Sequence, residues 1–247
     1  MKAVIKKILK ALGLKVTKLS SRRVLPVPCV DNIEIVVFFC NLMKKKISLL
    51  QIGACDGQTS DSIYKYIKAG NINAYLVEPS QVNFNKLSSF YDSNGSEVTL
   101  INAAIADKDE KKTFYSIKDE GRWKDNGWAR QLASFYKQHI SKHGIADHEI
   151  KEEEVDCFTL QTVINKYGIK KLDILVIDTE GYDGEIVKMA LSQNILPDFI
   201  AFENVQLVKT YSQNELDDLY KRLGQKGYVW THDRINTLAI KKDFLSI

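Results

Sequence analysis

Carboxylates that could act in catalysis follow two apolar runs of this sequence. Residues 172–177 (LDILVI) are followed by the tetrapeptide DTEG at 178–181, and the apolar residues 199–202 are followed by Glu203. A carboxylate in either place can take a proton from a hydroxyl group that is about to react. The alternative role for Asp178 is that of a cap for a helix that begins near Gly184. The candidate catalytic residues are therefore Asp178, Glu180 and Glu203.

A glycine-rich turn follows a third apolar run, at residues 49–52. Gly53 and Gly57 allow the backbone to bend sharply and to approach a ligand where a Cβ would clash. A helical pattern begins close behind. Strand, glycine turn and helix in this order predict the start of a nucleotide-binding βαβ unit. The GxxxG spacing differs from GxGxxG, which argues against a dinucleotide, and a turn without any ligand is the alternative.

An acidic residue lies where the ribose of such a ligand would need one. Residues 74–77 are apolar and end in Glu78-Pro79, so that Glu78 stands 21 positions after Gly57. An acid about 20 residues beyond a glycine turn is placed to bind a ribose diol. The two features together predict an adenosine-type ligand.

Alternating strands and helices would have to position these residues. A further apolar run lies at residues 98–105, and two more, at 227–230 and 237–240, have the pattern of a closing antiparallel pair. The runs at residues 49–52, 74–77, 172–177 and 199–202 all lead into polar or acidic residues or the glycine turn. We therefore expect one edge of a parallel sheet to carry the site. The sequence therefore predicts an α/β fold, and no internal repeat is visible.

The net charge of +4 is unevenly distributed. Residues 1–23 contain eight lysines and arginines and no acid, whereas the remaining chain has 27 basic and 31 acidic residues. The acidic body argues against a nucleic-acid groove. Apolar positions within residues 2–19 have helical spacing, so we expect a basic amphipathic helix and linker over 1–30 and the main domain over 31–247. The helix either lies on an anionic membrane surface or packs against protein.

The cysteines and the apolar runs bear on the compartment. The four cysteines form no CxxC pair and have no histidines at zinc spacing, which favours reduced thiols in a cytoplasmic protein. No run has the pattern of a signal peptide or approaches the ~20 apolar residues of a membrane span. We therefore expect a cytoplasmic protein, peripheral at the membrane surface if the N-terminal helix binds lipid.

Residues 118–150 form the least regular stretch and hold three of the four histidines. A segment this long between core strands is typical of a lid or substrate loop. A helix over residues 135–143 would place His139 and His143 on one face, where such a pair can bind metal. Surface histidines on a lid helix are the interpretation we adopt. Trp123 and Trp128 either stack on a sugar or pack within the lid.

The order of these pieces resembles the FkbM-type methyltransferases, a branch of the class I methyltransferases that use S-adenosylmethionine. The resemblance spans roughly residues 31–245. It is carried by LLQIGACDGQTSD (49–61), LVEPS (76–80), NAAIAD (102–107), ASF (133–135) and LDILVIDTEGYDGEIVK (172–188). It implies a Rossmann-like, mostly parallel sheet of seven strands, with helices on both faces and an antiparallel last strand.

The resemblance also implies roles for individual residues. The glycine turn would hold the methionine part of S-adenosyl-L-methionine, and Glu78 would bind the ribose hydroxyls. Asn102 and Ala103 would flank the adenine. Asp61, at an acidic position of the family's first helix, either binds the ligand or stabilises the helix start. The full set of cofactor-binding residues expected in this way is Gln51, Gly53, Ala54, Cys55, Asp56, Gly57, Asp61, Glu78, Pro79, Asn102, Ala103 and Asp178.

The expected reaction is methyl transfer to a hydroxyl group of a sugar, a glycan or another small molecule, with no nucleic-acid partner and no metal assigned. Carboxylates that hold a divalent cation are the alternative to direct proton transfer. Gln51 stands where many relatives have an acid, and Asn204 where relatives often have histidine. These departures keep a second hypothesis open, a non-catalytic protein that binds the cofactor or a membrane surface. The absent GxGxxG disfavours a third, an NAD-dependent oxidoreductase.

Overall fold

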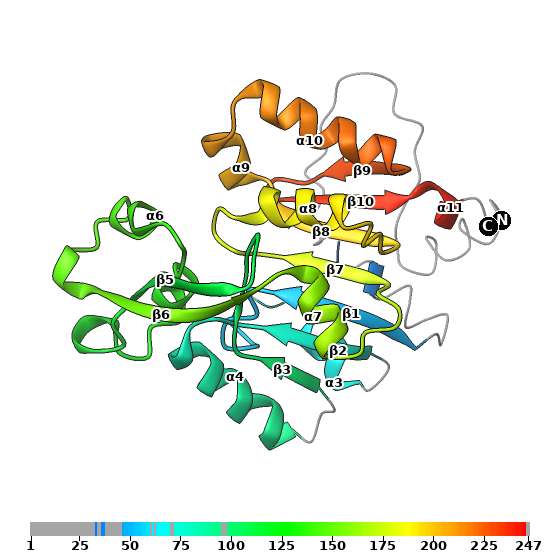
Figure 1. Cartoon of the computed structure of the whole chain (residues 1–247). Coiled ribbons are helices and arrows are strands. Elements are labelled where there is room, and N and C mark those ends of the chain that lie inside the picture. Colours follow the sequence, from blue (N-terminus) through cyan, green and yellow to red (C-terminus); the bar gives the residue numbers. More distant parts are fainter. Residues whose placement is uncertain are drawn as a thin grey trace, which may run out of the picture. The chain divides into compact units, whose positions relative to one another are not determined.

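A seven-stranded sheet forms the core of the computed structural model of this chain (Figure 1). The strands lie side by side in the order β3-β2-β1-β7-β8-β10-β9. β10 runs antiparallel to both its neighbours, whereas β1, β2, β3, β7 and β8 pair in parallel. This arrangement confirms the predicted α/β fold with a mostly parallel sheet of seven strands. The strands are β1 (Ile47–Ile52), β2 (Ile72–Val77), β3 (Val98–Ile101), β7 (Ile174–Ile177), β8 (Phe199–Glu203), β9 (Tyr228–His232) and β10 (Asn236–Lys241).

The structure describes residues 33, 36–37, 46–59, 61, 63–69, 72–94 and 98–245. Contacts divide the chain into residues 1–30 and residues 31–247, and the described residues belong to the second unit. The basic helix predicted within residues 1–30 lies outside the described residues and stays a prediction. Of the helices that are described, none has the length and apolar content to cross a lipid bilayer.

The register of the sheet aligns the strand ends that carry the predicted site. β1 lies between β2 and β7, and Ile52 pairs with both Val77 and Ile177. Ile177 pairs in turn with Phe202 of β8. The carboxyl ends of these parallel strands therefore meet at one edge of the sheet. The residues that follow the paired positions are Gly53, Glu78, Asp178 and Glu203.

Helices cover both faces of the sheet, which explains why nearly every residue of β1 is buried. On one face α7, α8 and α10 bury apolar side chains such as Val163, Ile186 and Leu219. On the other face α3 and α4 do so through Ile67 and Leu87. The helices are α3 (Tyr64–Lys68), α4 (Gln81–Asn94), α5 (Gly127–Gln131), α6 (Lys137–Ser141), α7 (Leu160–Lys166), α8 (Asp183–Ser192), α9 (Val205–Thr210), α10 (Gln213–Gln225) and α11 (Lys242–Leu245), with short 3-10 turns η1 (Gly121–Trp123) and η2 (Asp147–Glu149).

A second sheet of three strands stands beside this core. β4 (Ala104–Ile105), β6 (Ile150–Phe158) and β5 (Glu110–Ile117) lie in that order. β5 and β6 run antiparallel along their whole length. β5 includes the alternating residues 113–117, and its partner begins at Ile150. Residues 118–149 connect the two strands and form the stretch predicted to be a lid, here called the lid (Figure 1).

The strand predicted over residues 98–105 is divided between the two sheets. β3 ends at Ile101, and β4 begins at Ala104 and pairs with β6. Asn102 holds the break, because its side-chain amide donates hydrogen bonds to the backbone oxygens of Glu78 and Pro79, at 2.9 and 3.2 Å. Such a contact of a side chain with backbone competes with strand pairing, and the apolar pattern alone does not reveal it.

Candidate active site

A cavity of about 400 Å³ opens at the carboxyl edge of the main sheet and collects most of the residues predicted from the sequence. Asp56, Gly57 and Asn102 are not among its lining residues. Asp56 and Asn102 instead hold the backbone that forms the cavity wall. The predicted residues that line the cavity are Gln51, Gly53, Ala54, Cys55, Asp61, Glu78, Pro79, Ala103, Asp178, Glu180 and Glu203.

The glycine turn after β1 has a backbone that requires glycine at residue 53. Gly53 has a φ of +86°, and a Cβ there would lie 1.8 Å from the backbone oxygen of Asp178. The N–H groups of Gly53 and Ala54 both donate to the backbone oxygen of Val77, at 2.9 and 3.0 Å. The turn is thereby held against β2 and β7 with no room for a side chain.

Asp56 is part of the glycine turn and fixes its shape, although its side chain does not line the cavity. Its Oδ1 accepts hydrogen bonds from the N–H groups of Gln58 and Thr59, at 3.2 and 2.8 Å. Its Oδ2 accepts from the Thr59 hydroxyl at 2.6 Å and from Nη2 of Arg130 at 3.0 Å. Burial favours the neutral carboxyl group, but these hydrogen bonds outweigh it and hold the pKa of Asp56 below its usual value. Asp56 is therefore an anion that orders the turn.

Glu78 is buried at the end of β2, and its carboxylate is already hydrogen-bonded to protein. Oε2 accepts from the N–H of Cys55 at 2.9 Å. Oε1 accepts from the N–H of Ser80 at 2.9 Å and from the side-chain amide of Asn83 at 3.5 Å. Burial outweighs these hydrogen bonds and raises the pKa of Glu78 to about 7. A carboxylate oxygen can accept two hydrogen bonds, so Oε2 keeps capacity for a ligand hydroxyl.

Gln51 and Asp61 meet at the cavity wall. Gln51 Nε2 donates to Asp61 Oδ2 at 3.2 Å. Asp61 Oδ1 accepts from the N–H groups of Ile63 and Tyr64, at 2.8 and 3.2 Å. Asp61 therefore stabilises the start of α3 while it also lines the cavity. Within the described ranges, Oε1 of Gln51 is buried without a hydrogen-bond partner.

Asp183 holds the loop that follows β7. Its side chain is buried, and its Oδ2 accepts from the Thr179 hydroxyl at 2.9 Å and from the Gly181 N–H at 3.3 Å. Its Oδ1 accepts from the Glu203 N–H at 3.3 Å, which ties the loop to the end of β8. Burial raises the pKa of Asp183 to about 6. This residue was not predicted, although an acid in the first turn of a helix is a recognisable signal.

Asp178 borders the cavity with other acids around it. Helix α8 is capped at Tyr182, so Asp178 is not the helix cap that was its alternative role. The side chain is exposed to solvent. Burial within the site, and then the carboxylates of Asp183 and Glu180, raise the pKa of Asp178 well above its usual value.

Glu180 contacts a histidine of the lid. Its Oε2 lies 3.0 Å from His139 Nε2, an ion-pair distance, though among the described residues this nitrogen has no aligned hydrogen bond. Lys142 Nζ lies 3.1 Å from His139 Nδ1 and donates to Gln206 Oε1 at 3.1 Å. His139 is 6% exposed, so the expectation of a surface histidine is wrong for this residue, because its contact with Glu180 draws it inward. His143 is exposed.

Glu203 ends β8 with one carboxylate oxygen unpaired. In the part of the chain that the structure describes, its Oε2 is buried without a hydrogen-bond partner. Burial, and then the charges of Glu180 and Asp183, raise the pKa of Glu203 to about 7, partly offset by nearby lysines. Such a group can gain or lose a proton at neutral pH. The next residue, Asn204, is not among the lining residues and donates its N–H to a backbone oxygen.

An apolar part of the lining comes from the second sheet and the lid. Residues 103–105 line it after the end of β3, and Phe114 of β5 and Phe135 of the lid complete it. The two phenylalanine rings pack edge to face with their centroids 5.4 Å apart, and Phe135 packs in the same way on Tyr182. The sequence did not predict these aromatics, since the pairing of β5 with β6 that places them is non-local.

The two tryptophans lie outside the lining of the cavity. Their ring centroids are 6.0 Å apart, and Trp123 Nε1 donates to Glu149 at 2.9 Å. Trp128 is 46% exposed and packs its ring against His143. They therefore pack within the lid, which is the second of the two roles considered for them.

The described residues offer no three histidine, cysteine, aspartate or glutamate side chains that are placed to hold a metal ion. His139 and His143 lie with their ring centroids 5.5 Å apart and tilted. Asp183 and Glu180 interact instead with backbone, threonine and histidine groups, as described above.

Comparison with known proteins gives one family match. The sequence profile described as "Methyltransferase FkbM domain" matches residues 51–230. A search of curated proteins gave no match. Similar solved structures include a methyltransferase FkbM from Methylobacillus flagellatus, with 13% identity, 80% of this chain and 44% of that chain covered and a TM-score of 0.47. This chain therefore spans less than half of that protein.

Two further solved structures are similar to the chain. One is an S-adenosylhomocysteine-bound methyltransferase PaMTH1 from Podospora anserina, with 14% identity, coverage of 85% and 77% of the two chains and a TM-score of 0.44. The other is fibrillarin from Aeropyrum pernix with bound S-adenosyl-L-methionine, with 12% identity, coverage of 82% and 72% and a TM-score of 0.42.

The family match covers most of the chain. It includes the glycine turn, Glu78, the loop held by Asp183 and the end of β8, so it contains most of the residues that line the cavity. Members of this family use S-adenosyl-L-methionine as the methyl donor. The chain therefore belongs to the FkbM methyltransferase family and is an S-adenosyl-L-methionine-dependent methyltransferase.

Proposed function

We propose that the protein transfers the methyl group to a hydroxyl group of a sugar, a glycan or another small molecule. The observation that carries this proposal is the carboxylate of Glu203, which lines the cavity. One of its oxygens lacks a partner among the described residues, and its pKa is raised to about 7. A hydroxyl acceptor must lose a proton when it is methylated, and a base poised near neutral pH suits that step.

The groups around the cavity fit the methyl donor. The carboxylate of Glu78 has capacity for a ribose hydroxyl, and the wall that contains Phe114 and Phe135 suits a flat adenine. The buried Oε1 of Gln51, unpaired within the described residues, offers an acceptor for the ammonium group of the methionine part. Gln51 therefore replaces the acid of many relatives with a neutral acceptor.

In this proposal the protein chiefly aligns the methyl donor with the acceptor. S-adenosyl-L-methionine supplies a methyl group on a sulfonium, which is already activated for displacement. Asp56 holds the glycine turn and Asp183 holds the loop after β7 through hydrogen bonds, so that the chain itself shapes both walls of the site. Preorganisation of this kind lowers the barrier by removing the need to order the reacting groups.

The three acids at the carboxyl edge have different roles in this proposal. Glu203 accepts the proton of the acceptor hydroxyl at its unpaired oxygen. Glu180, held by its contact with His139, orients the hydroxyl as a hydrogen-bond acceptor. Asp178 borders the turn that holds the donor, since Gly53 packs directly on its backbone.

The test is an acceptor screen with the full-length protein. Purified protein is incubated with S-adenosyl-L-methionine and a panel of sugars, glycans, alcohols, amines and thiols, and products are identified by mass spectrometry. Methylated hydroxyl products that disappear in Glu203→Gln are the expected result. Methylation of amines or thiols alone, or full activity of the Glu203→Gln variant, would contradict the proposal.

We propose separately that the protein is cytoplasmic and contacts anionic membranes through residues 1–23, which lie outside the described residues. Their basic, amphipathic sequence supports this location. Deletion of residues 1–23 should abolish co-sedimentation with anionic vesicles and leave cofactor binding unchanged. Loss of cofactor binding instead would indicate that the helix packs on the main domain.

A further inference from the structure

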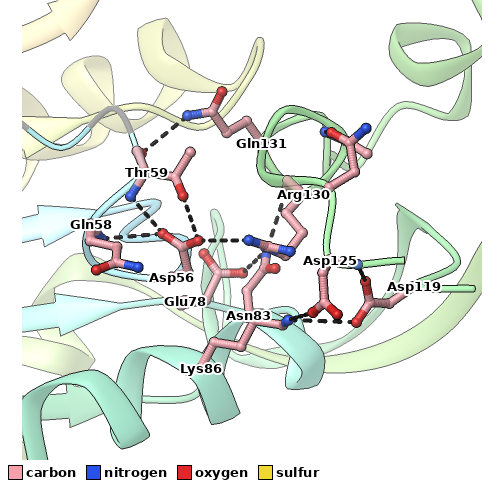
Figure 2. Close-up of polar contacts among 12 residues, drawn as sticks. Asp56, Gln58, Thr59, Glu78, Asn83, Lys86, Asp119, Asp125, Arg130 and Gln131 are labelled. Carbon is pink, nitrogen blue, oxygen red and sulfur yellow. Dashed lines mark hydrogen bonds and ion pairs between the residues drawn. The ribbon is translucent and has the colours of Figure 1, made fainter. Parts of the chain in front are cut away.

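Arg130, which no sequence pattern singled out, connects the lid to the glycine turn. It lies in α5 and lines the cavity. Figure 2 shows its guanidinium group directed at Asp56, to which Nη2 donates at 3.0 Å. The same carboxylate accepts the N–H groups of Gln58 and Thr59. A single carboxylate thus links Arg130 to the conformation of the turn.

Two further contacts fasten the part of the lid that contains α5, residues 119–131, here called the clasp. Gln131 Nε2 donates to the backbone oxygen of Thr59 at 3.1 Å. Asn83 Nδ2 donates to the backbone oxygen of Arg130 at 3.2 Å, and its amide also lies 3.5 Å from Glu78 Oε1 (Figure 2). The clasp therefore contacts both the turn and a residue that holds the ribose-binding carboxylate.

The first residues of the clasp are joined to α4 by charges. Lys86 Nζ lies 2.8 Å from Asp125 Oδ1 and 3.7 Å from Asp119 Oδ2 (Figure 2). Asp119 also accepts the N–H of Asp125 at 2.8 Å. Solvent-exposed pairs of this kind add little stability. The contacts of Arg130 and Gln131 with the turn are therefore the ones that can hold the clasp closed.

The ion pair of Arg130 and Asp56 is better suited to positioning than to stabilising. The two side chains are 13% and 5% exposed. Within the residues that the structure describes, Nε and Nη1 of Arg130 are buried without hydrogen-bond partners. As a whole such a pair adds little net stability, because removing its charges from water offsets their attraction, but loss of Arg130 alone would leave the buried charge of Asp56 without its partner.

We propose that Arg130 is a positioning residue that couples closure of the clasp to cofactor binding. The proposal rests on binding of S-adenosyl-L-methionine in this cavity. A bound cofactor favours the ordered turn, and the ordered turn presents Asp56 to Arg130. The closed clasp in turn slows cofactor release. Because such coupling is reciprocal, the cofactor should protect the clasp as much as the clasp retains the cofactor.

The experiment measures both directions of the coupling on the full-length protein, with S-adenosylhomocysteine as the probe. Calorimetry gives its Kd for the unmodified protein, Arg130→Met and Gln131→Ala. Hydrogen exchange of residues 119–131 is followed with and without the probe. We expect Arg130→Met to weaken binding roughly tenfold and Gln131→Ala to weaken it less. The probe should slow exchange of the clasp in the unmodified protein and not in Arg130→Met.

A control variant removes an exposed ion pair elsewhere in the chain. Arg222→Met removes an arginine that donates to Asp218 at 2.7 Å on the exposed face of α10, and it should change neither measurement. Binding by Arg130→Met within twofold of the unmodified protein, or equal protection of its clasp, would overturn the proposal. If Arg130→Met does not fold, the proposal is overturned when the probe slows exchange of the clasp in Gln131→Ala as much as in the unmodified protein. The assay contains no acceptor, so its outcome is independent of the hydroxyl specificity proposed above.

Discussion

Gly53 packs directly against the backbone of Asp178, so closely that a Cβ on residue 53 would lie 1.8 Å from the Asp178 oxygen. The N–H of Asp178 donates to the backbone oxygen of Ile52 at 2.9 Å. No side chain separates the glycine turn from the loop that carries the acids. In the proposed reaction, the donor and acceptor sites would therefore be two parts of one backbone surface.

Gly53→Ala should disrupt this surface. The added methyl group overlaps backbone, which cannot rotate away as a side chain can, and the residue keeps a φ of +86°. We expect loss of cofactor binding together with destabilisation of about 3 kcal/mol or more. Urea unfolding and calorimetric titration measure the two effects. The matched control is Gly144→Ala, a positive-φ position with no atom within 4 Å of the new Cβ, which should leave cofactor binding intact.

Glu78→Gln should weaken cofactor binding without changing the shape of the site. The amide keeps the size of the carboxylate, but it loses the charge-assisted hydrogen bonds to ribose and presents an NH₂ group to N–H donors. We expect binding of S-adenosylhomocysteine to weaken by ~1–3 kcal/mol, which is about 5- to 150-fold. Isothermal titration tests this, and an unchanged Kd would contradict the assignment of the ribose site.

Glu203→Gln should affect turnover rather than cofactor binding. Burial and then its acidic neighbours raise the pKa of Glu203 to about 7, so its base form is lost as the pH falls below 7. We therefore expect kcat/KM to fall by about tenfold for each pH unit below 7. In Glu203→Gln the rate should be roughly 10²- to 10⁴-fold lower and lack this dependence. Retention of the pH profile by the variant would assign the base elsewhere.

The stability of the ligand-free protein should decrease as the pH rises from about 5 to 7.5. Burial raises the pKa of Glu78 to about 7 and that of Asp183 to about 6, above their values in an unfolded chain. The folded state therefore binds more protons in this range, and the stability present at low pH is lost as these groups ionise. Urea unfolding at several pH values measures the slope, and Glu78→Gln should flatten it. Stability that rises with pH over this range would contradict the raised pKa values of Glu78 and Asp183.

Strand positions and most cavity residues followed from the sequence because they depend on local patterns. The apolar run before Gly53 and the one before Asp178 were visible as strands, and parallel pairing then required their ends to meet. The family resemblance supplied the strand number and the antiparallel end. The closing pair of strands, β9 and β10, was predicted nearly to the residue.

Most of the contacts that were not predicted join residues far apart in the chain. Arg130 reaches Asp56, His139 reaches Glu180, and Phe114 reaches Phe135 through a sheet whose strands enclose the lid. No periodicity in the sequence marks such partners, because each depends on how the lid folds back. Asn102 belongs to the same class, since its side chain ends a strand by bonding to a neighbouring loop.

The position of β1 in the sheet has a consequence for synthesis of the chain on the ribosome. β1 pairs on one side with β2, which follows at once, and on the other side with β7, where Leu49 meets Ile174. Until residues 174–177 have emerged, β1 is an apolar strand with one bare edge. The emerging amino-terminal half, which contains the glycine turn, therefore exposes a strand edge that can pair with other chains until β7 completes the sheet.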